Sequence, residues 1–141
     1  MRELGSGDIL YMLGAIRWTL LLSLVAFAGG AAGGALVALA RTGRFRWLRL
    51  AAAGFIKVFQ GTPLLMQLFL AFFAPGIFGI DVDPWAAAAL GLSLHASAFL
   101  GEIWRGSIEV VPAGQSEAAT SLGLPYWPTM VLIVAPQAVR I

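Results

Sequence analysis

The spacing of charged residues divides the chain into long uncharged runs, which predict membrane-spanning helices. The first run covers residues 18–40 and lies between Arg17 and Arg41. A helix of these 23 residues would be about 34 Å long, enough to cross a hydrocarbon core of about 30 Å. A cleaved secretory signal is the alternative, because Ala38-Leu39-Ala40 resembles a cleavage site. The length of the run and the acidic residues before it favour a retained span.

Two shorter apolar runs and a final apolar stretch follow. The second run lies between Lys57 and Asp81, and its most apolar part is residues 64–80; the third covers residues 85–100. Both are close to the lower length limit for a span, so their ends are expected to extend into neighbouring polar residues. A fourth stretch begins at about Trp127, is too short to cross by itself, and predicts the opening of a fourth helix. The pattern therefore predicts an all-α polytopic membrane protein with three full spans and the start of a fourth.

The composition supports a membrane protein and excludes several other classes. Of the 141 residues, 60% are hydrophobic and 11% are charged, whereas about a quarter of a soluble domain is charged. An ordinary soluble enzyme and a disordered chain are excluded on this ground. The chain has no cysteine and one histidine, so disulfides and cysteine nucleophiles are excluded and no metal site is expected. A net charge of +2 is too small to indicate a nucleic-acid partner.

The basic residues are concentrated between the first two runs. Five of the nine lie there, with no acidic residue among them: Arg41, Arg44, Arg46, Arg49 and Lys57. The positive-inside rule predicts that residues 41–57 form a short cytoplasmic connection. The N-terminal segment, residues 1–14, is then extracytoplasmic, as is the turn that carries Asp81 and Asp83. Residues 102–128, which follow the third run, return to the cytoplasm.

Three polar side chains within the apolar runs are candidates for a functional role. Gln67 lies within the second run, and His95 and Ser97 lie near the middle of the third. A polar group in lipid needs a partner or a water-filled cavity, so two interpretations stay open: these residues form hydrogen bonds between helices, or they line a pathway through the membrane. His95 and Ser97 are too close in sequence to point at one another on a helix. A Ser–His hydrolase pair is therefore excluded, and no catalytic residue is predicted.

Small residues in the first run predict a surface on which another helix packs. Glycines four residues apart let a second backbone approach closely, and this run holds two overlapping pairs of them: Gly29, Gly30, Gly33 and Gly34. The alternative is general glycine richness, since the chain holds 17 glycines. At the entrance of the second run, Thr62 is expected to cap the first helical turn, because Pro63 fits a helix start.

The segment after the third run predicts a charged helix end and then a short separate helix. Glu102, Arg105 and Glu109 are spaced i, i+3 and i+7, so they share one helical face and can form ion pairs. Residues 113–124 favour helix, and Gly123 marks its end. A helix this short is marginal in water by itself, so it needs a surface to dock against.

Within this segment, Glu117-Ala118-Ala119 followed by Gly123, Ile133 and Pro136 resembles the EAA signature of ABC-importer permease subunits. Further stretches resemble the branch of that family that transports polar amino acids. They are residues 60–68 (QGTPLLMQL), 99–106 (FLGEIWRG), 111–115 (VPAGQ) and 136–141 (PQAVRI). Each motif is weak alone, but together and in this order they are specific. The resemblance extends from about residue 15 to the end of the chain.

The resemblance implies the transmembrane domain of a type I ABC importer over residues 15–141. The family continues past Pro136 with the rest of the fourth helix and a fifth, so the chain resembles a fragment of such a domain. It also implies a cytoplasmic coupling helix at about residues 113–124, whose contacts with a partner ATPase come from Glu117, Ala118, Ala119 and Gly123. That ATPase would bind ATP and Mg, so this chain would need no cofactor and would not itself be an enzyme.

The implied function is the import of polar amino acids by alternating access across the cytoplasmic (inner) membrane of a bacterium. The implied partners are the cytoplasmic ATPase, a second permease subunit (identical or homologous), an extracytoplasmic substrate-binding protein and the lipid bilayer. Two alternatives stay open: a permease for another solute, such as methionine or phosphate, and a membrane scaffold that transports nothing. The motifs at residues 60–68 and 95–106 favour the amino acid branch.

Overall fold

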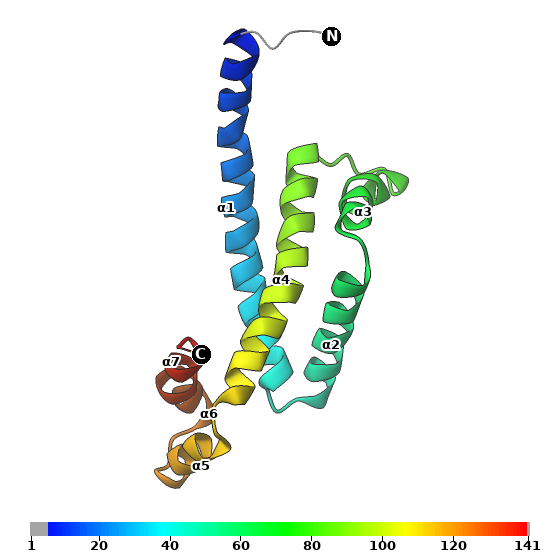
Figure 1. Ribbon diagram of the computed structural model, residues 1–141. Helices are drawn as coiled ribbons and strands as arrows, with labels where there is room; N and C mark the ends of the chain where they lie inside the picture. Colours follow the sequence, from blue (N-terminus) through cyan, green and yellow to red (C-terminus); the bar gives the residue numbers. More distant parts are fainter. Residues whose placement is uncertain (1–5, 141) are drawn as a thin grey trace.

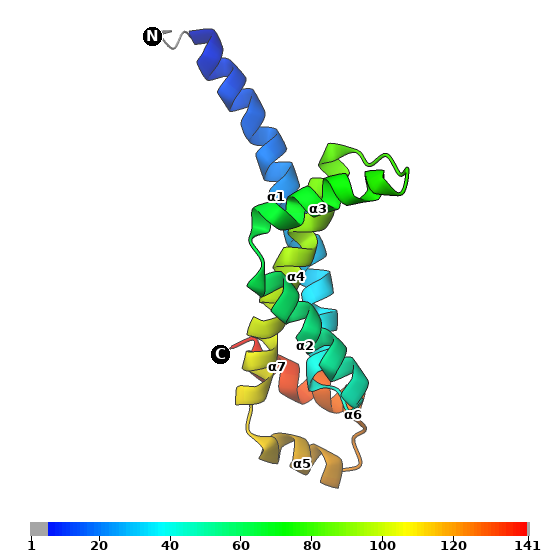
Figure 2. The ribbon, with the colours of Figure 1, turned by 90° about the vertical axis from the view of Figure 1, so that its right-hand side faces the viewer.

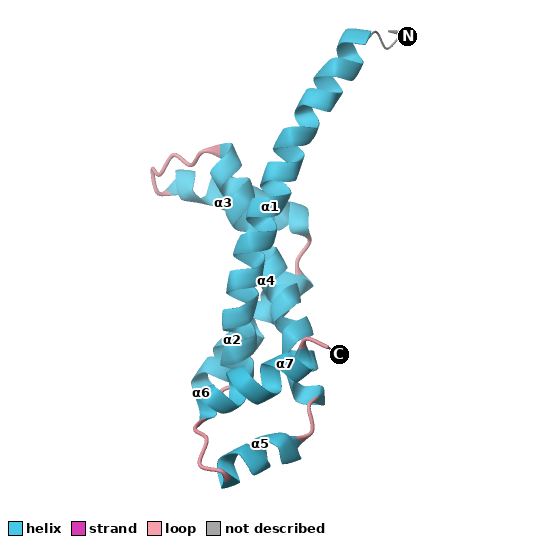
Figure 3. Ribbon diagram, turned by 90° about the vertical axis from the view of Figure 1, so that its left-hand side faces the viewer, coloured by secondary structure: helices cyan, strands magenta, loops and turns pink. Residues whose placement is uncertain are grey.

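The computed structural model describes residues 6–140, and every regular element within them is a helix (Figure 3). In chain order the elements are α1 (Ser6–Thr42), α2 (Arg46–Gly61), α3 (Leu64–Ile77), α4 (Pro84–Val110), α5 (Ala113–Ser121), α6 (Tyr126–Thr129), the π-helical turn η1 (Met130–Val134) and α7 (Ala135–Ala138). Helices satisfy their own backbone hydrogen bonds, as a chain in lipid must. The all-α architecture predicted from the uncharged runs is confirmed.

Two helices are long and apolar enough to cross a membrane by length and composition: Leu10–Thr42 within α1, and Pro84–Val110, which is α4. They contain the first and third predicted runs and extend past both. α1 and α4 lie side by side, and the N-terminal half of α1 stands clear of the other helices (Figure 1). Residues 6–14, which the sequence assigns to a separate N-terminal segment, continue α1, whereas residues 1–5 of that segment lie outside the described residues.

The second crossing differs from the prediction of one span over residues 64–80 and a short connection over residues 41–57. Residues 46–57 belong instead to α2, α3 ends at Ile77, and the two helices meet at an angle of 106°. α2 packs along α4, and α3 then turns across the bundle (Figure 2). If the bent pair is one broken span, the described residues make up to three crossings. Most of the basic residues expected in a loop therefore lie on a helix.

The break between α2 and α3 follows from Pro63. A proline disfavours helical geometry in the residue before it, and Thr62 is accordingly extended, with φ −116° and ψ 142°. Pro63 itself occupies the N-cap of α3, where no side chain caps the helix, so the predicted capping by Thr62 is wrong. The Thr62 hydroxyl instead donates to the carbonyl oxygen of Val58 at 2.8 Å, which closes the end of α2.

The contact between α1 and α4 is built from small residues. A Cβ atom added to Gly34 would lie 2.9 Å from the Cβ of Leu100 and 3.1 Å from the backbone nitrogen of Gly101. The other three glycines of the predicted packing surface also face α4, where an added Cβ would meet Ser93, Ala96 or Ser97: Gly29, Gly30 and Gly33. Real side chains do not fit at such separations, so the backbones approach as closely as they do because these positions are glycine.

The short helix α5 lies at one end of the molecule, beyond the ends of α2 and α4 (Figure 2). The sequence predicts helix over residues 113–124, and the observed helix ends at Ser121. Gly123 then adopts φ +78°, a left-handed conformation that favours glycine. Its N–H donates to the carbonyl of Thr120 at 2.9 Å, and the N–H of Leu124 donates to that of Ala119 at 3.0 Å. These bonds satisfy carbonyls that the helix end leaves free.

The fourth predicted helix is present as α6, η1 and α7, which follow one another without a break from Tyr126 to Ala138. Its buried side chains pack with the end of α4 in a small apolar cluster: Val111, Met130, Val134 and Ala138. Leu39 of α1 and Ile108 of α4 pack against this cluster. The segment after α5 is thereby attached to both long helices.

Candidate functional site

Gln67, near the start of α3, is the polar centre of the α2–α3 break. Its side chain is buried, with 8% of the residue exposed. The amide nitrogen donates to the carbonyl oxygens of Phe59 at 2.7 Å and Thr62 at 3.0 Å, and it lies 2.8 Å from the Thr62 hydroxyl. These carbonyls lose their helical partners because Pro63 interrupts the helix. Gln67 therefore supplies hydrogen bonds that the broken helix cannot make for itself.

The other end of the same amide binds α4. The Gln67 oxygen lies 3.1 Å from Nδ1 of His95, and the imidazole also packs against Phe99 with ring centroids 4.7 Å apart. The contacts of the amide nitrogen fix which end of the amide faces His95. Because the amide oxygen only accepts hydrogen bonds, Nδ1 of His95 carries the hydrogen. In the neutral ring Nε2 is then an acceptor. The contact with Gln67 therefore selects one of the two neutral tautomers of His95.

Ser97 does not join Gln67 and His95. It is 4% exposed, its hydroxyl donates to the Ser93 carbonyl at 2.7 Å, and it packs against Gly33 of α1. Two residues along a helix correspond to about 200° of rotation, so His95 and Ser97 lie on nearly opposite faces of α4. The structure thus brings two of the three candidate pathway residues together and sets the third in the α1–α4 contact.

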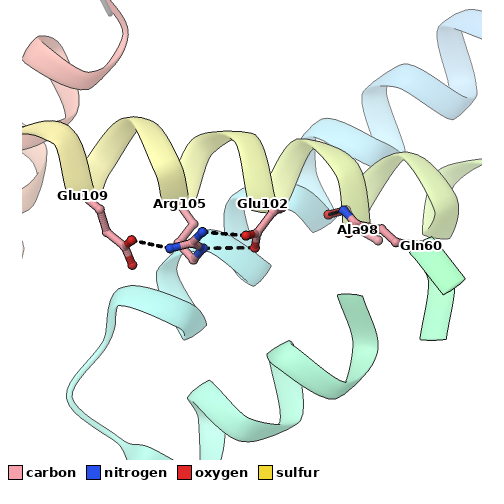
Figure 4. A network of polar contacts seen from close by, with 5 residues as sticks. All are labelled: Gln60, Ala98, Glu102, Arg105 and Glu109. Carbon is pink, nitrogen blue, oxygen red and sulfur yellow. Dashed lines mark hydrogen bonds and ion pairs between the residues drawn. The ribbon is translucent and has the colours of Figure 1, made fainter. Parts of the chain in front are cut away.

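A charged network lies on α4, C-terminal to Ser97, on the face that looks toward α2 (Figure 4). Arg105 binds Glu102 through two bonds, Nη2 to Oε1 at 2.5 Å and Nε to Oε2 at 3.0 Å, and also pairs with Glu109. The predicted ion pairs are therefore present. Gln60 reaches the carbonyl of Ala98 at 3.5 Å, an α2–α4 contact that the sequence did not indicate.

The residues of the EAA-like signature occupy α5 and the turn after it. Ala119 is 1% exposed, since α5 packs on α6 and η1, whereas Glu117 and Ala118 are exposed. Gly123 makes the left-handed turn that leads out of the helix. One face of α5 is thus anchored to the fourth helix, and the other presents a carboxylate and a small residue at the end of the molecule.

Among residues 10–140, whose side chains the structure describes, no group of three or more His, Cys, Asp or Glu side chains could hold a metal ion. Among these residues, the polar features that stand out are the Gln67–His95 pair, the Arg105 network and the exposed face of α5.

Residues 30–141 match the family described as binding-protein-dependent transport system inner membrane component. The match covers most of the chain, which therefore belongs to this family. The resemblance that the EAA-like signature indicates is confirmed.

Individual relatives are permeases of amino acid transporters. The probable amino-acid ABC transporter permease YckA of Bacillus subtilis (strain 168) is 40% identical over 131 residues, which are 93% of this chain and 58% of that permease. The L-cystine transport system permease TcyB of the same bacterium is 36% identical over 128 residues, covering 91% and 55%. The putative glutamine transport system permease GlnP of Rickettsia bellii (strain RML369-C) is 38% identical over 136 residues, covering 96% and 62%. The chain thus spans somewhat more than half the length of these relatives.

A solved structure has the same fold. The crystal structure of an amino acid ABC transporter with histidines superposes with a TM-score of 0.82 at 32% sequence identity, covering 99% of this chain and 67% of that one. The broken second crossing and the helical segments after α4 are therefore parts of an ABC-transporter permease fold. The predicted fold class is confirmed.

Proposed function

We propose that this chain is the transmembrane subunit of an ATP-driven importer that moves polar amino acids into the bacterial cytoplasm by alternating access. Family membership and the amino acid permeases among its relatives support the class of substrate. The observation that carries the proposal is α5, a short helix anchored by Ala119 whose Glu117 and Ala118 are exposed at one end of the molecule.

The partner at α5 is a cytoplasmic ATPase that binds ATP and Mg. Ala118 permits close approach, and the Glu117 carboxylate can bind a basic side chain of that subunit. Because α5 packs on α6 and η1, and these pack on the end of α4, a movement of α5 is passed to the membrane helices. Rigid helices that tilt together are a common way to open a site alternately to two sides.

The orientation follows from charge and from the place of α5. The basic end of the bundle, with Arg41, Arg44 and Arg46 at the α1–α2 turn, is also the end at which α5 lies (Figure 1). The positive-inside rule assigns this end to the cytoplasm. The start of α1 and the turn with Asp83 then face outward, where a substrate-binding protein docks. A second permease subunit, identical or homologous, completes the pathway.

Gln67 and His95 are the pathway residues in this proposal. Irregular backbone within a membrane is stable only where it is buried in protein or lines a cavity, and transporters often bind substrates at such broken helices. The Gln67 amide holds the broken backbone, and His95 keeps a ring nitrogen that can accept a hydrogen bond from an ammonium group.

The test is uptake by a transporter assembled from this chain with the ATPase and the binding protein of an amino acid ABC importer. Labelled glutamine, arginine and cystine are offered with methionine and phosphate as comparisons. The proposal predicts ATP-dependent accumulation of at least one polar amino acid and none of the comparisons. Uptake of methionine or phosphate alone would show that the chain transports another class of solute. A complex that forms but imports nothing would indicate a scaffold.

A further inference from the structure

A cavity of about 430 Å³ with a mixed lining lies where α1, α2, α4, α5, α6 and η1 come together. Its apolar lining comes from the end of α4 and from η1, and its polar lining comes from the five α-helices: Arg41, Thr42, Arg49, Glu109, Ser116 and Tyr126. The permease function proposed above gives no role to this cavity, which is separate from both the Gln67–His95 pair and the exposed face of α5.

The charges of the cavity favour an anion. The two ion pairs of the described residues both belong to Arg105, and one of them occupies Glu109, the acidic residue of the lining. Among residues 10–140, whose side chains the structure describes, neither Arg41 nor Arg49 has a carboxylate within ion-pair distance, and Nη1 of Arg49 donates only to the Gly43 carbonyl, at 3.5 Å. Nε of Arg41 is moreover buried there without a hydrogen-bond partner. A buried N–H without an acceptor is costly, and a guanidinium matches the oxygen atoms of a phosphate group.

An apolar groove of about 880 Å³ lies beside this cavity. Tyr126 lines both spaces, so the two are adjacent. The groove runs between the end of α1, the α1–α2 turn and the start of α6, and its larger apolar lining residues are Leu36, Leu39, Phe45, Leu48 and Trp127. Arg44 also lines it. A cationic site suited to an oxygen-rich anion thus borders an apolar space.

We propose that the cavity and groove together bind one anionic phospholipid, with its phosphate between Arg41 and Arg49 and an acyl chain in the groove. A free phosphate would satisfy the arginines and leave the groove empty, whereas a phospholipid fills both. Basic pockets between transmembrane helices on the cytoplasmic side are suited to anionic headgroups. Only the choice of leaflet rests on the proposed orientation; the choice of ligand rests on the lining residues.

The site has a structural consequence. Its lining joins the end of α1 to Ser116 of α5 and Tyr126 of α6. A lipid bound there contacts α1, α5 and α6. It therefore links a membrane-spanning helix to the segment that would pass the movement of α5 to the other helices. The composition of the surrounding lipid then affects how firmly α5 is held.

The test measures lipid retained by the full purified chain in native mass spectrometry from detergent. Dioleoyl-phosphatidylglycerol is compared with dioleoyl-phosphatidylcholine, which has the same chains and no net charge. Each arginine near an anionic headgroup contributes about fivefold in affinity, so R41Q/R49Q is expected to lose roughly tenfold or more of the phosphatidylglycerol retained. K57Q is the matched control, because Lys57 is an exposed cation of α2 outside the cavity, and it should retain lipid as the natural chain does.

Three results would overturn the proposal. They are equal retention of the two lipids by the unmodified chain, an equal loss in K57Q and R41Q/R49Q, and displacement of the lipid by millimolar inorganic phosphate, which would reveal a site for a free anion. The first and third need no variant, so misfolding of R41Q/R49Q cannot mask them. None of these measurements involves ATP or amino acid uptake, so their failure would leave the permease function standing.

Discussion

Helix α4 packs against α1 on one face and against the α2–α3 break on another, and different forces act on the two faces. On the α1 side, glycines meet small residues, and an added Cβ at Gly34 would come within 3.1 Å of the Gly101 backbone. On the other side, one buried amide at Gln67 joins two backbone carbonyls to His95. The first contact depends on shape along its whole length. The second depends on a few hydrogen bonds, so a single side chain can disrupt it.

The largest effect is expected from filling the α1–α4 contact. In G30V/G34V the new side chains would meet Ala96 and Leu100, and overpacking costs about 1–3 kcal/mol at each site. Thermal unfolding in detergent micelles, followed by circular dichroism, should show a strong loss of stability. G54V is the control, because nothing lies within 4 Å of an added Cβ at Gly54. Equal losses in the two proteins would mean that helix propensity, not the close contact, is responsible.

Removing the amide of Gln67 should have the next largest effect. Q67L leaves the carbonyls of Phe59 and Thr62 and the His95 N–H without this partner, and an unsatisfied buried polar group costs about 1–3 kcal/mol. Q67E keeps the size of the side chain but loses the donors, so it should be destabilised to a similar extent. Spin-label distances between α2 and α3 should broaden in both variants. A Q67E protein as stable as the natural chain would contradict the role of the amide donors.

His95 offers a smaller and more specific test. It is the only histidine in the sequence, so its ring nitrogens can be assigned in a ¹⁵N spectrum without ambiguity. The neutral ring should carry its hydrogen on Nδ1, because Nδ1 faces the amide oxygen of Gln67. In Q67L this preference should be lost. H95F leaves one buried group, the Gln67 oxygen, without this partner and should cost about 1–3 kcal/mol, less than Q67L, which leaves three groups without theirs. A ring protonated on Nε2 alone would contradict the geometry of the pair.

The Arg105 network should contribute least. The Glu109 side chain is 55% exposed, and exposed ion pairs contribute about 0.2–1 kcal/mol. E109Q should therefore change the unfolding midpoint only slightly. E102Q removes the two-bond partner, whose side chain is 34% exposed, and should have the larger effect of the two. An E109Q protein as unstable as Q67L would show that the network, and not the amide, holds this face of α4.

The sequence predicted the α1 and α4 crossings because long uncharged runs mark them, and it missed α2 because Lys57 and the arginines interrupt the pattern. Arg46, Arg49 and Lys57 lie on α2, a helix whose apolar residues Ala52 and Ile56 are buried. The Gln67–His95 contact joins residues 28 apart, and only the break at Pro63 brings the carbonyls to the amide. The separation of Ser97 from His95, by contrast, was available from helical geometry alone.

The short helix α5 was predicted almost completely because its signals are local. Helix-favouring residues fill it, and Gly123 follows it with φ +78°, the left-handed conformation in which a glycine commonly ends a helix. Its burial pattern was not predictable, because Ala118 and Ala119 are identical residues and only the packing on η1 distinguishes them. Which face is free for a partner is therefore information that the fold adds.

The most direct test of the account is the number of amino acid molecules imported per ATP hydrolysed by the assembled transporter. In E117A/G123A the exposed carboxylate and the left-handed turn are both altered, whereas Q115A changes an exposed residue of the same helix. ATP hydrolysis should continue in E117A/G123A while uptake falls by roughly tenfold or more, which corresponds to the loss of about one charge-assisted contact. Q115A should behave as the natural chain. Unchanged uptake per ATP in E117A/G123A would contradict the claim that α5 couples the ATPase to the membrane helices.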